Sequence, residues 1–169
     1  LWGARRRHDA GQAARHFLGL SIAVSLFLLS AGLLLNRLAM QLLGAAPEVI
    51  AVSLPYSTLI FLVIPFTVLL QVLSSILQGT GDTKTPMYAM IVVNLLHIFI
   101  AYPLIYGHWG LPALGVKGAA IAVGIAEAVG TCYLTIRCFP LLHRSTHIRF
   151  DLFRTIWQVG APVSGERIM

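Results

Sequence analysis

The sequence predicts an all-α fold, a polytopic helix bundle that crosses a membrane several times. Hydrophobic residues make up 57% of the 169 residues and charged residues only 11%, against about 45–50% and about 25% in ordinary soluble domains. The mean hydropathy is +0.82, and long uncharged runs separate the charged residues. This composition excludes a disordered chain, a secreted disulfide scaffold and most soluble enzymes.

The uncharged runs predict four membrane-spanning helices, because about 20 apolar residues in a helix cross the hydrocarbon core. The second run has no charge between Glu48 and Asp82, so we expect a tilted helix that is kinked at Pro65. Thr85 and Pro86 predict the N-cap and the first helical position of the third helix. We expect the four helices at about 17–36, 47–78, 86–106 and 117–139.

The residues after the fourth helix predict a basic linker at 141–154 and a further helix that begins near Thr155. From there to Met169 the chain has 15 residues, which as a helix span roughly 22 Å at about 1.5 Å per residue. A bilayer core is about 30 Å thick. We therefore expect this chain to be a piece of a longer protein.

Lysine and arginine are distributed unevenly between the two ends of the predicted helices. Nine of them lie in the N-terminal stretch, the loop after the second helix, and the end of the fourth helix with the stretch that follows. The other two loops hold only Arg37 and Lys117, so the first set is expected in the cytoplasm. This distribution accounts for the net charge of +6, and we expect no nucleic-acid partner, which would need a basic patch on a folded domain.

Polar residues inside the predicted spans are candidates for function, because unpaired polar groups facing lipid cost free energy. On the third helix, Asn94 and His97 are neighbours. His97 suits either a structural hydrogen bond or proton coupling, because imidazole titrates near neutral pH. The second helix carries a stripe on one face, which either interhelical hydrogen bonding or a wet cavity wall explains. The stripe consists of Thr67, Gln71, Ser74, Ser75 and Gln78.

Two glutamates lie inside predicted helices, where a carboxylate must face protein or water. Glu127 lies in the fourth helix, whose small residues recur every four positions from Gly118 to Gly130 and predict close packing. Glu166 follows Pro162 by four residues, and backbone groups freed near a proline often line a cavity. A coupling-ion or substrate role and a structural role are both open for these glutamates.

An enzyme is not expected from the motifs in the chain. The string from Gly79 to Asp82 matches the short GxGD of intramembrane aspartyl proteases, which need a second aspartate in a facing helix. The other aspartates, Asp9 and Asp151, lie in polar stretches outside the spans. No phosphate-binding glycine loop and no zinc-ligand spacing is present, so we expect no cofactor and no metal site.

Three stretches in fixed order resemble the multidrug and toxic compound extrusion (MATE) family, whose members are cation-coupled multidrug exporters. They are 78–86 (QGTGDTKTP), 105–107 (IYG) and 114–120 (LGVKGAA). The resemblance covers nearly the whole chain, as far as the Gly-Ala-Pro at 160–162. It implies a fold of two six-helix lobes, with the substrate in a cavity between them and alternating access.

The resemblance also implies a place in that fold for each part of the chain. The four helices would be helices three to six, so that residues 1–140 form part of the N-terminal lobe. Residues 141–154 would link the lobes in the cytoplasm, and 155–169 would begin helix seven and the C-terminal lobe. Many members carry an Asn in helix five and an Asp or Asn four residues later, and His97 and Ala101 stand at those positions here.

The function implied is that of an antiporter in the inner (plasma) membrane, exchanging Na⁺ or H⁺ for amphipathic, often cationic, drugs. Its partners would be lipid, small-molecule drugs or toxins, and the remaining helices of the full-length chain. A lipid-linked precursor flippase of the same wider superfamily and a non-transporting membrane fragment are the alternatives. Candidate substrate or coupling-ion residues are Glu166, Glu127, His97 and Asn94, and candidate cavity-lining residues are Thr67, Gln71, Ser74 and Gln78.

Overall fold

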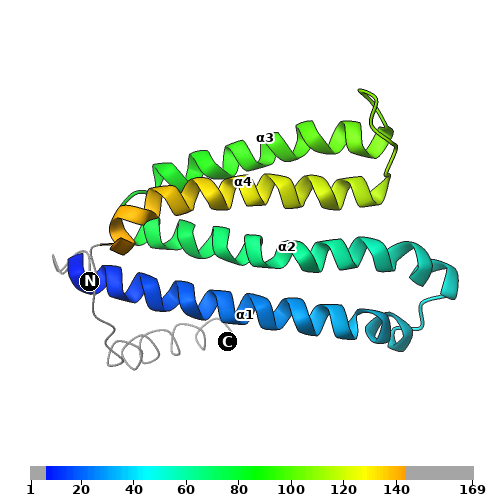
Figure 1. Ribbon diagram of the computed structural model, residues 1–169, viewed down its shortest axis with the longest axis horizontal. Helices are drawn as coiled ribbons and strands as arrows, with labels where there is room; N and C mark the ends of the chain where they lie inside the picture. The colour runs from blue at the N-terminus through cyan, green and yellow to red at the C-terminus, as the bar shows by residue number, and fades with distance from the viewer. Residues whose placement is uncertain (1–6, 144–169) are drawn as a thin grey trace, which may run out of the picture.

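The computed structural model describes residues 7–143, which form four long helices (Figure 1). They are α1 (Arg7–Leu42), α2 (Pro47–Gly79), α3 (Lys84–Tyr106) and α4 (Val116–His143). The helices lie side by side and alternate in direction along the chain, so the predicted all-α fold is confirmed over these residues. The helix predicted near Thr155 lies outside the described residues.

The arrangement of the helices leaves α2 and α3 apart from each other. The helix α4 packs against both of them, and α1 packs mainly on α2. In contrast, α2 and α3 make few direct contacts. The space beside α4, between α2 and α3, is therefore where the chain has room for a cavity.

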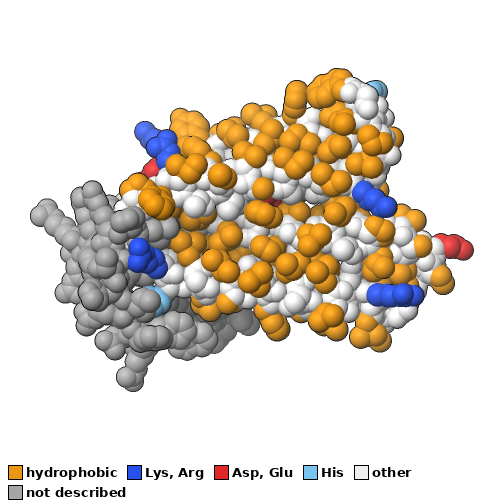
Figure 2. Space-filling view, in the orientation of Figure 1, with side chains coloured by type: hydrophobic (Ala, Val, Ile, Leu, Met, Phe, Trp, Pro, Cys, Tyr) orange, Lys and Arg blue, Asp and Glu red, His pale blue; other side chains and the backbone are white. Residues whose placement is uncertain are grey.

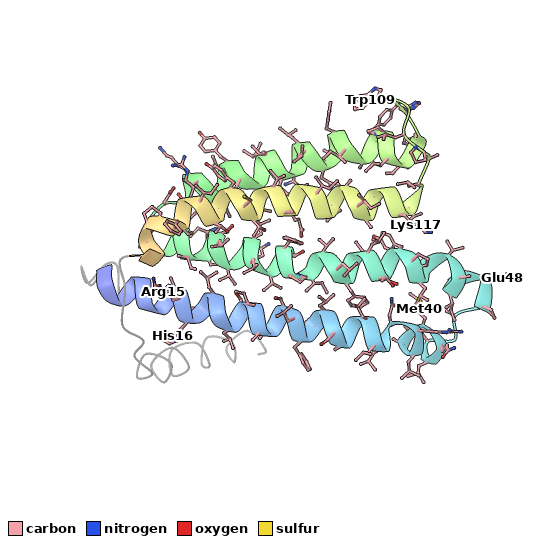
Figure 3. The ribbon with its side chains drawn as sticks, viewed as in Figure 1. Arg15, His16, Met40, Glu48, Trp109 and Lys117 are labelled. Atoms are coloured by element: carbon pink, nitrogen blue, oxygen red, sulfur yellow. The ribbon has the colours of Figure 1, made fainter. Side chains whose placement is uncertain are left out.

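All four helices are long and apolar enough to cross a membrane. Hydrophobic side chains cover the middle of the bundle, and the Lys and Arg side chains in view lie toward its two ends (Figure 2). Arg15 lies at the end where α1 begins, and Glu48 and Lys117 lie at the opposite end (Figure 3). We call the end of the bundle that holds Arg15 and the turn between α2 and α3 the Asp82 end. We call the opposite end the Glu48 end.

The first helix is longer than the predicted range 17–36, because α1 begins at Arg7 and ends at Leu42. Arg37 limits an apolar span, but a charged residue does not end a helix. The chain leaves the helix at Gly44, whose φ of 73° is left-handed and is adopted readily only by glycine. At the N-terminal end, the alanine, arginine and glutamine residues before residue 17 are good helix formers, so the helix begins earlier than predicted. The last helix, α4, likewise runs past the predicted end at residue 139 to His143.

The third helix starts earlier than predicted, at Lys84, with Thr83 as its N-cap. The prediction of Thr85 as N-cap and Pro86 as the first helical position was wrong. The reason is the Asp82 carboxylate, which accepts hydrogen bonds from the Thr85 amide (Oδ1, 3.0 Å) and the Thr85 hydroxyl (Oδ2, 2.6 Å). It satisfies a first-turn donor from outside the helix, and Pro86 in the first turn has no N–H to lose.

The Asp82 contacts make this turn sensitive to acid. The Thr85 hydroxyl, and next the Thr85 amide, hold the pKa of Asp82 below its usual value of 3.8. A lowered folded-state pKa stabilises the fold above the unfolded pKa, and this contribution is lost as pH falls through the folded pKa. We expect Asp82→Asn to lower the thermal unfolding midpoint in detergent at pH 7, and the difference from wild type to shrink below about pH 4.

The control for this expectation is Thr85→Val, which removes the hydroxyl but keeps the amide donor. It should lower the midpoint less than Asp82→Ala and should keep part of the pH dependence. A constant difference between wild type and Asp82→Asn from pH 7 to pH 3 would contradict the role of the carboxylate charge.

Small residues on α4 let the neighbouring helices approach closely, as their spacing predicts. Ala122 and Ala126 are 0% exposed and Ala120 is 1% exposed. A Cβ atom added at Gly118 would lie 2.5 Å from the Leu104 carbonyl oxygen of α3. The backbones of α3 and α4 therefore approach closely at Gly118 and Leu104.

A polar contact that the sequence did not single out joins α1 to α2. The Asn36 side chain is 7% exposed, and its Nδ2 donates to Ser57 Oγ at 2.8 Å and to Thr58 Oγ1 at 3.5 Å. Both hydroxyls also have backbone acceptors within α2, at the carbonyls of Ser53 and Leu54. In an apolar span, such a contact helps to hold two helices together.

We expect Asn36→Leu to destabilise the folded protein by about 1 kcal/mol, within the range measured for hydrogen bonds between membrane helices. The effect stays modest because Ser57 and Thr58 keep their backbone acceptors. The measurement is the unfolding midpoint in a denaturing-detergent titration. Ser30→Ala serves as the control, because the Ser30 hydroxyl bonds only within α1, to the Phe27 carbonyl (2.9 Å). Equal midpoints for the two variants would contradict the expectation.

Candidate functional site

Five of the polar residues singled out from the sequence line one small cavity between α2, α3 and α4, of about 100 Å³, which we call the inner cavity. Thr67 and Gln71 come from α2, Asn94 and His97 from α3, and Glu127 from α4. Apolar side chains complete the wall: Leu70, Met90, Val93, Val123 and Ala126.

Glu127 lies near the middle of its membrane span. Lys117 lies ten positions from it toward the Glu48 end and Arg137 ten positions toward the Asp82 end, roughly 15 Å each way at about 1.5 Å per residue. A carboxylate at this depth costs about 2.5–3.5 kcal/mol on insertion scales. It therefore needs polar partners, and the inner cavity supplies them.

The partner of the Glu127 carboxylate is Thr67. The Thr67 hydroxyl donates a hydrogen bond to Glu127 Oε2, which joins α2 to α4 across 60 positions of sequence. One turn further along α4, the Thr131 hydroxyl donates to the Phe66 carbonyl of α2 at 3.0 Å. These two bonds hold the register between α2 and α4, so the Glu127 carboxylate has a defined position in the inner cavity.

A second cavity of about 260 Å³ lies between α2 and α3, toward the Asp82 end, and we call it the outer cavity. Gln71, Ser74 and Gln78 of α2 line one side, where the Ser74 hydroxyl donates to the Leu70 carbonyl at 2.7 Å. Thr83, Pro86, Met87 and Met90 form the rest of the wall. Gln71 and Met90 line both cavities, so the two adjoin at these residues.

The two cavities account for every candidate residue that the structure describes. Ser74 and Gln78 line the outer cavity, and the other five line the inner one. Ser75, predicted on the same face of α2, is exposed and lines neither. Glu166 lies outside the described residues. Met90 was missed, because an apolar residue on an apolar helix carries no signal in the sequence for a place between two cavities.

The side chains of the inner cavity offer one carboxylate, one imidazole, one hydroxyl and two amides. Within residues 7–143, no three His, Cys, Asp or Glu side chains come together in a way that could hold a metal ion. A single carboxylate beside a hydroxyl, two amides and an imidazole suits a proton or a monovalent cation. Carboxylates buried in membrane spans mark ion and substrate pathways.

Four apolar helices, with a cavity lined by polar side chains and a carboxylate at mid-span, define a multi-pass membrane protein. Comparisons with known proteins place it more narrowly. A family model described as MatE matches residues 1–103. The chain is 34% identical over 139 residues to the probable multidrug resistance protein YoeA of Bacillus subtilis, covering 77% of this chain and 30% of that protein. The chain belongs to the MatE family, which confirms the resemblance to MATE transporters.

Further comparisons agree with this family and with the fold. The chain is 30% identical over 170 residues to the probable multidrug resistance protein NorM of Streptococcus pneumoniae, covering 96% of this chain and 38% of that protein. A structure described as the inward-facing conformation of a multidrug resistance MATE family transporter matches 95% of this chain with a TM-score of 0.82 and 24% identity. The chain thus spans about a third of the length of these proteins.

Proposed function

We propose that this chain is part of a cation-coupled multidrug exporter, which exchanges Na⁺ or H⁺ for amphipathic or cationic compounds. Relatives described as probable multidrug resistance proteins support this function. We also propose the plasma membrane as its location, with the Asp82 end in the cytoplasm. Arg15, Lys84 and Arg137 lie toward that end, against Arg37 and Lys117 toward the other, as positive residues favour the cytoplasmic side.

The observation that carries the proposal is Glu127, a mid-span carboxylate bonded to Thr67 in the inner cavity. Drug-sized ligands occupy pockets of about 300–1,000 Å³, whereas the inner cavity measures about 100 Å³. That volume suits an ion or a few waters. We therefore assign Glu127 to the coupling ion, and we place the drug elsewhere in the full-length protein.

The Thr67–Glu127 hydrogen bond suggests how ion binding acts on the helices. When the carboxylate is ionised, the Thr67 hydroxyl donates to it, and charge-assisted bonds of this kind are strong. Protonation removes the charge and turns the carboxyl into a donor, and a bound Na⁺ would compete for the same oxygens. Either ion weakens the tie between α2 and α4, and so links ion occupancy to the relative position of the two helices.

The experiment that tests this function uses the full-length protein in proteoliposomes. Export of a fluorescent amphipathic cation is followed under an imposed pH gradient, an imposed Na⁺ gradient, or neither. We expect one of the two gradients to drive export. No movement of amphipathic cations under either gradient, from protein that is folded and reconstituted, would contradict the proposal.

A further inference from the structure

We propose that the inner and outer cavities form one hydrated path, through which Glu127 exchanges protons with the aqueous phase at the Asp82 end. The coupling ion of this site is then the proton. This inference rests on the proposed function, in which Glu127 is the coupling residue. It assigns a side of entry and a set of lining residues to that site.

Polar side chains of α2 lead from Glu127 to the Asp82 end without a long gap. Thr67 contacts Glu127, and Gln71, Ser74 and Gln78 follow at steps of four, three and four residues. At about 1.5 Å per residue, each step is roughly 4.5–6 Å along the helix. One water molecule bridges two polar groups at such a separation. The series spans the roughly 15 Å between Glu127 and the charged end of the bundle.

The cavities are large and polar enough to hold that water. A buried water needs about 10–15 Å³ of accessible space and two to four polar partners, and the cavities measure about 260 Å³ and about 100 Å³. The outer cavity offers the amides of Gln71 and Gln78 and the hydroxyls of Ser74 and Thr83. The path exists because α2 and α3 pack on α4 rather than on each other.

The residues that the two cavities share favour a proton over a metal cation. At the junction, Gln71 offers an amide, but Met90 offers only a thioether and hydrocarbon. A proton passes along a single chain of hydrogen-bonded water, whereas Na⁺ moves with several oxygen ligands around it, of which the two shared side chains supply only one. In the exchange, the Glu127 carboxylate takes one proton from a hydronium ion in the inner cavity and becomes a carboxylic acid, and the reverse step returns the proton to water.

The other titratable group that lines the inner cavity is His97, on α3. The helix α2 contributes the uncharged Thr67, Leu70 and Gln71 to the lining, and α1 contributes nothing to it. On α4 itself, the charged side chains of Lys117 and Arg137 lie ten residues away in each direction. Glu127 and His97 are thus the two groups that can hold a proton at the inner end of the path.

The first test is the reactivity of introduced cysteines in the full-length protein, with Cys132 and Cys138 replaced by alanine. Met90→Cys lies at the junction of the cavities, and Val92→Cys is the matched control on the same helix. Val92 is 54% exposed on the apolar surface and lines neither cavity. Because a thiol reacts as its thiolate and needs water, a charged thiosulfonate added at the cytoplasmic side should label Met90→Cys at least about tenfold faster.

Equal labelling rates for the two cysteines would overturn the path, as would faster labelling of Met90→Cys from the opposite side of the membrane. A second variant covers the chance that one substitution fails to fold. Gln71→Cys lines both cavities on α2, so it should share the reactivity of Met90→Cys. A Gln71→Cys protein that is folded and unreactive would also overturn the path.

The final experiment closes the junction with a large side chain. Met90→Trp should slow export driven by a pH gradient at least about tenfold, since filling the junction interrupts the water, while Val92→Trp should export at the wild-type rate. If Glu127→Gln abolishes export but Met90→Trp does not slow it, the path is overturned and the proposed function stands. If Glu127→Gln exports normally, the proposed role of Glu127 fails, and the path to it fails with it.

Discussion

Glu127→Gln is expected to abolish ion-driven drug export by the full-length protein while leaving the yield of folded protein unchanged. Glutamine has nearly the shape of glutamate, and its amide oxygen still accepts a hydrogen bond from Thr67. It carries no charge and takes up no proton in the range where a carboxylate does. The measurement is dye export from proteoliposomes under the gradient that drives the wild-type protein.

Two further variants separate the charge of Glu127 from its position. Thr67→Val removes the hydroxyl that donates to Glu127 Oε2 and leaves the carboxylate, so export should fall but not vanish. Glu48→Gln is the matched control, because Glu48 lies in the exposed first turn of α2 and lines neither cavity. It should export at the wild-type rate.

The outcome that would contradict this expectation is a Glu127→Gln protein that exports like wild type. A variant that loses only folded yield, and exports normally per folded molecule, would show that Glu127 is a structural partner of Thr67. The per-molecule rate therefore has to be normalised to protein that runs as a single species in mild detergent.

Gly118→Ala is expected to cause the largest loss of stability among the glycine-to-alanine substitutions in α4. The added Cβ would lie 2.5 Å from the Leu104 carbonyl oxygen and 2.7 Å from its carbon. These are backbone atoms of α3. Unlike the end of a flexible side chain, they cannot move away from the added Cβ without a shift of the helix. The same carbonyl accepts a hydrogen bond from the Leu114 amide at 2.9 Å, so a shift of α3 also disturbs the loop after it.

The expected cost is about 1–3 kcal/mol, as for an overpacked core. It should appear as a lower midpoint in a denaturing-detergent titration and a lower yield of folded protein. Gly19→Ala is the matched control, because a Cβ at Gly19 meets nothing within 4 Å and alanine is the better helix former. Equal midpoints for Gly118→Ala and Gly19→Ala would show that α3 and α4 do not pack as closely as the structure has them.

Much of the candidate site could be predicted from the sequence, residue by residue. Thr67, Gln71, Asn94, His97 and Glu127 stand out because polar groups inside apolar spans are costly, and each of them lines the inner cavity. Their grouping could not be predicted. Nor could the contact of Asn36 with Ser57 and Thr58, because side chains on different helices meet only when both helices have a defined rotation and register.

The spacing of residues nevertheless predicted some of the packing. Small residues at steps of four on α4 predicted close approach, and Gly118, Ala122 and Ala126 are buried against neighbouring helices. The N-cap of α3 was predicted wrongly, since the Asp82 carboxylate bonds forward to Thr85. The residue that caps a helix depends on the local backbone conformation. Several turn-forming residues lie in this short loop, so the sequence does not show which of them is the cap.

By itself, the sequence determined the four apolar spans within residues 7–143 and the polar residues inside them. Each span must be about 20 apolar residues long, and each helix satisfies its own backbone hydrogen bonds, so these features depend on local sequence alone. Only the tertiary structure decided that α4 lies between α2 and α3, that Thr67 bonds Glu127, and that two cavities adjoin at Gln71 and Met90. The physical reason is that these helices are apolar on every side, so the sequence does not show which side of a helix contacts its neighbour. Their pairing follows from close packing across the whole bundle.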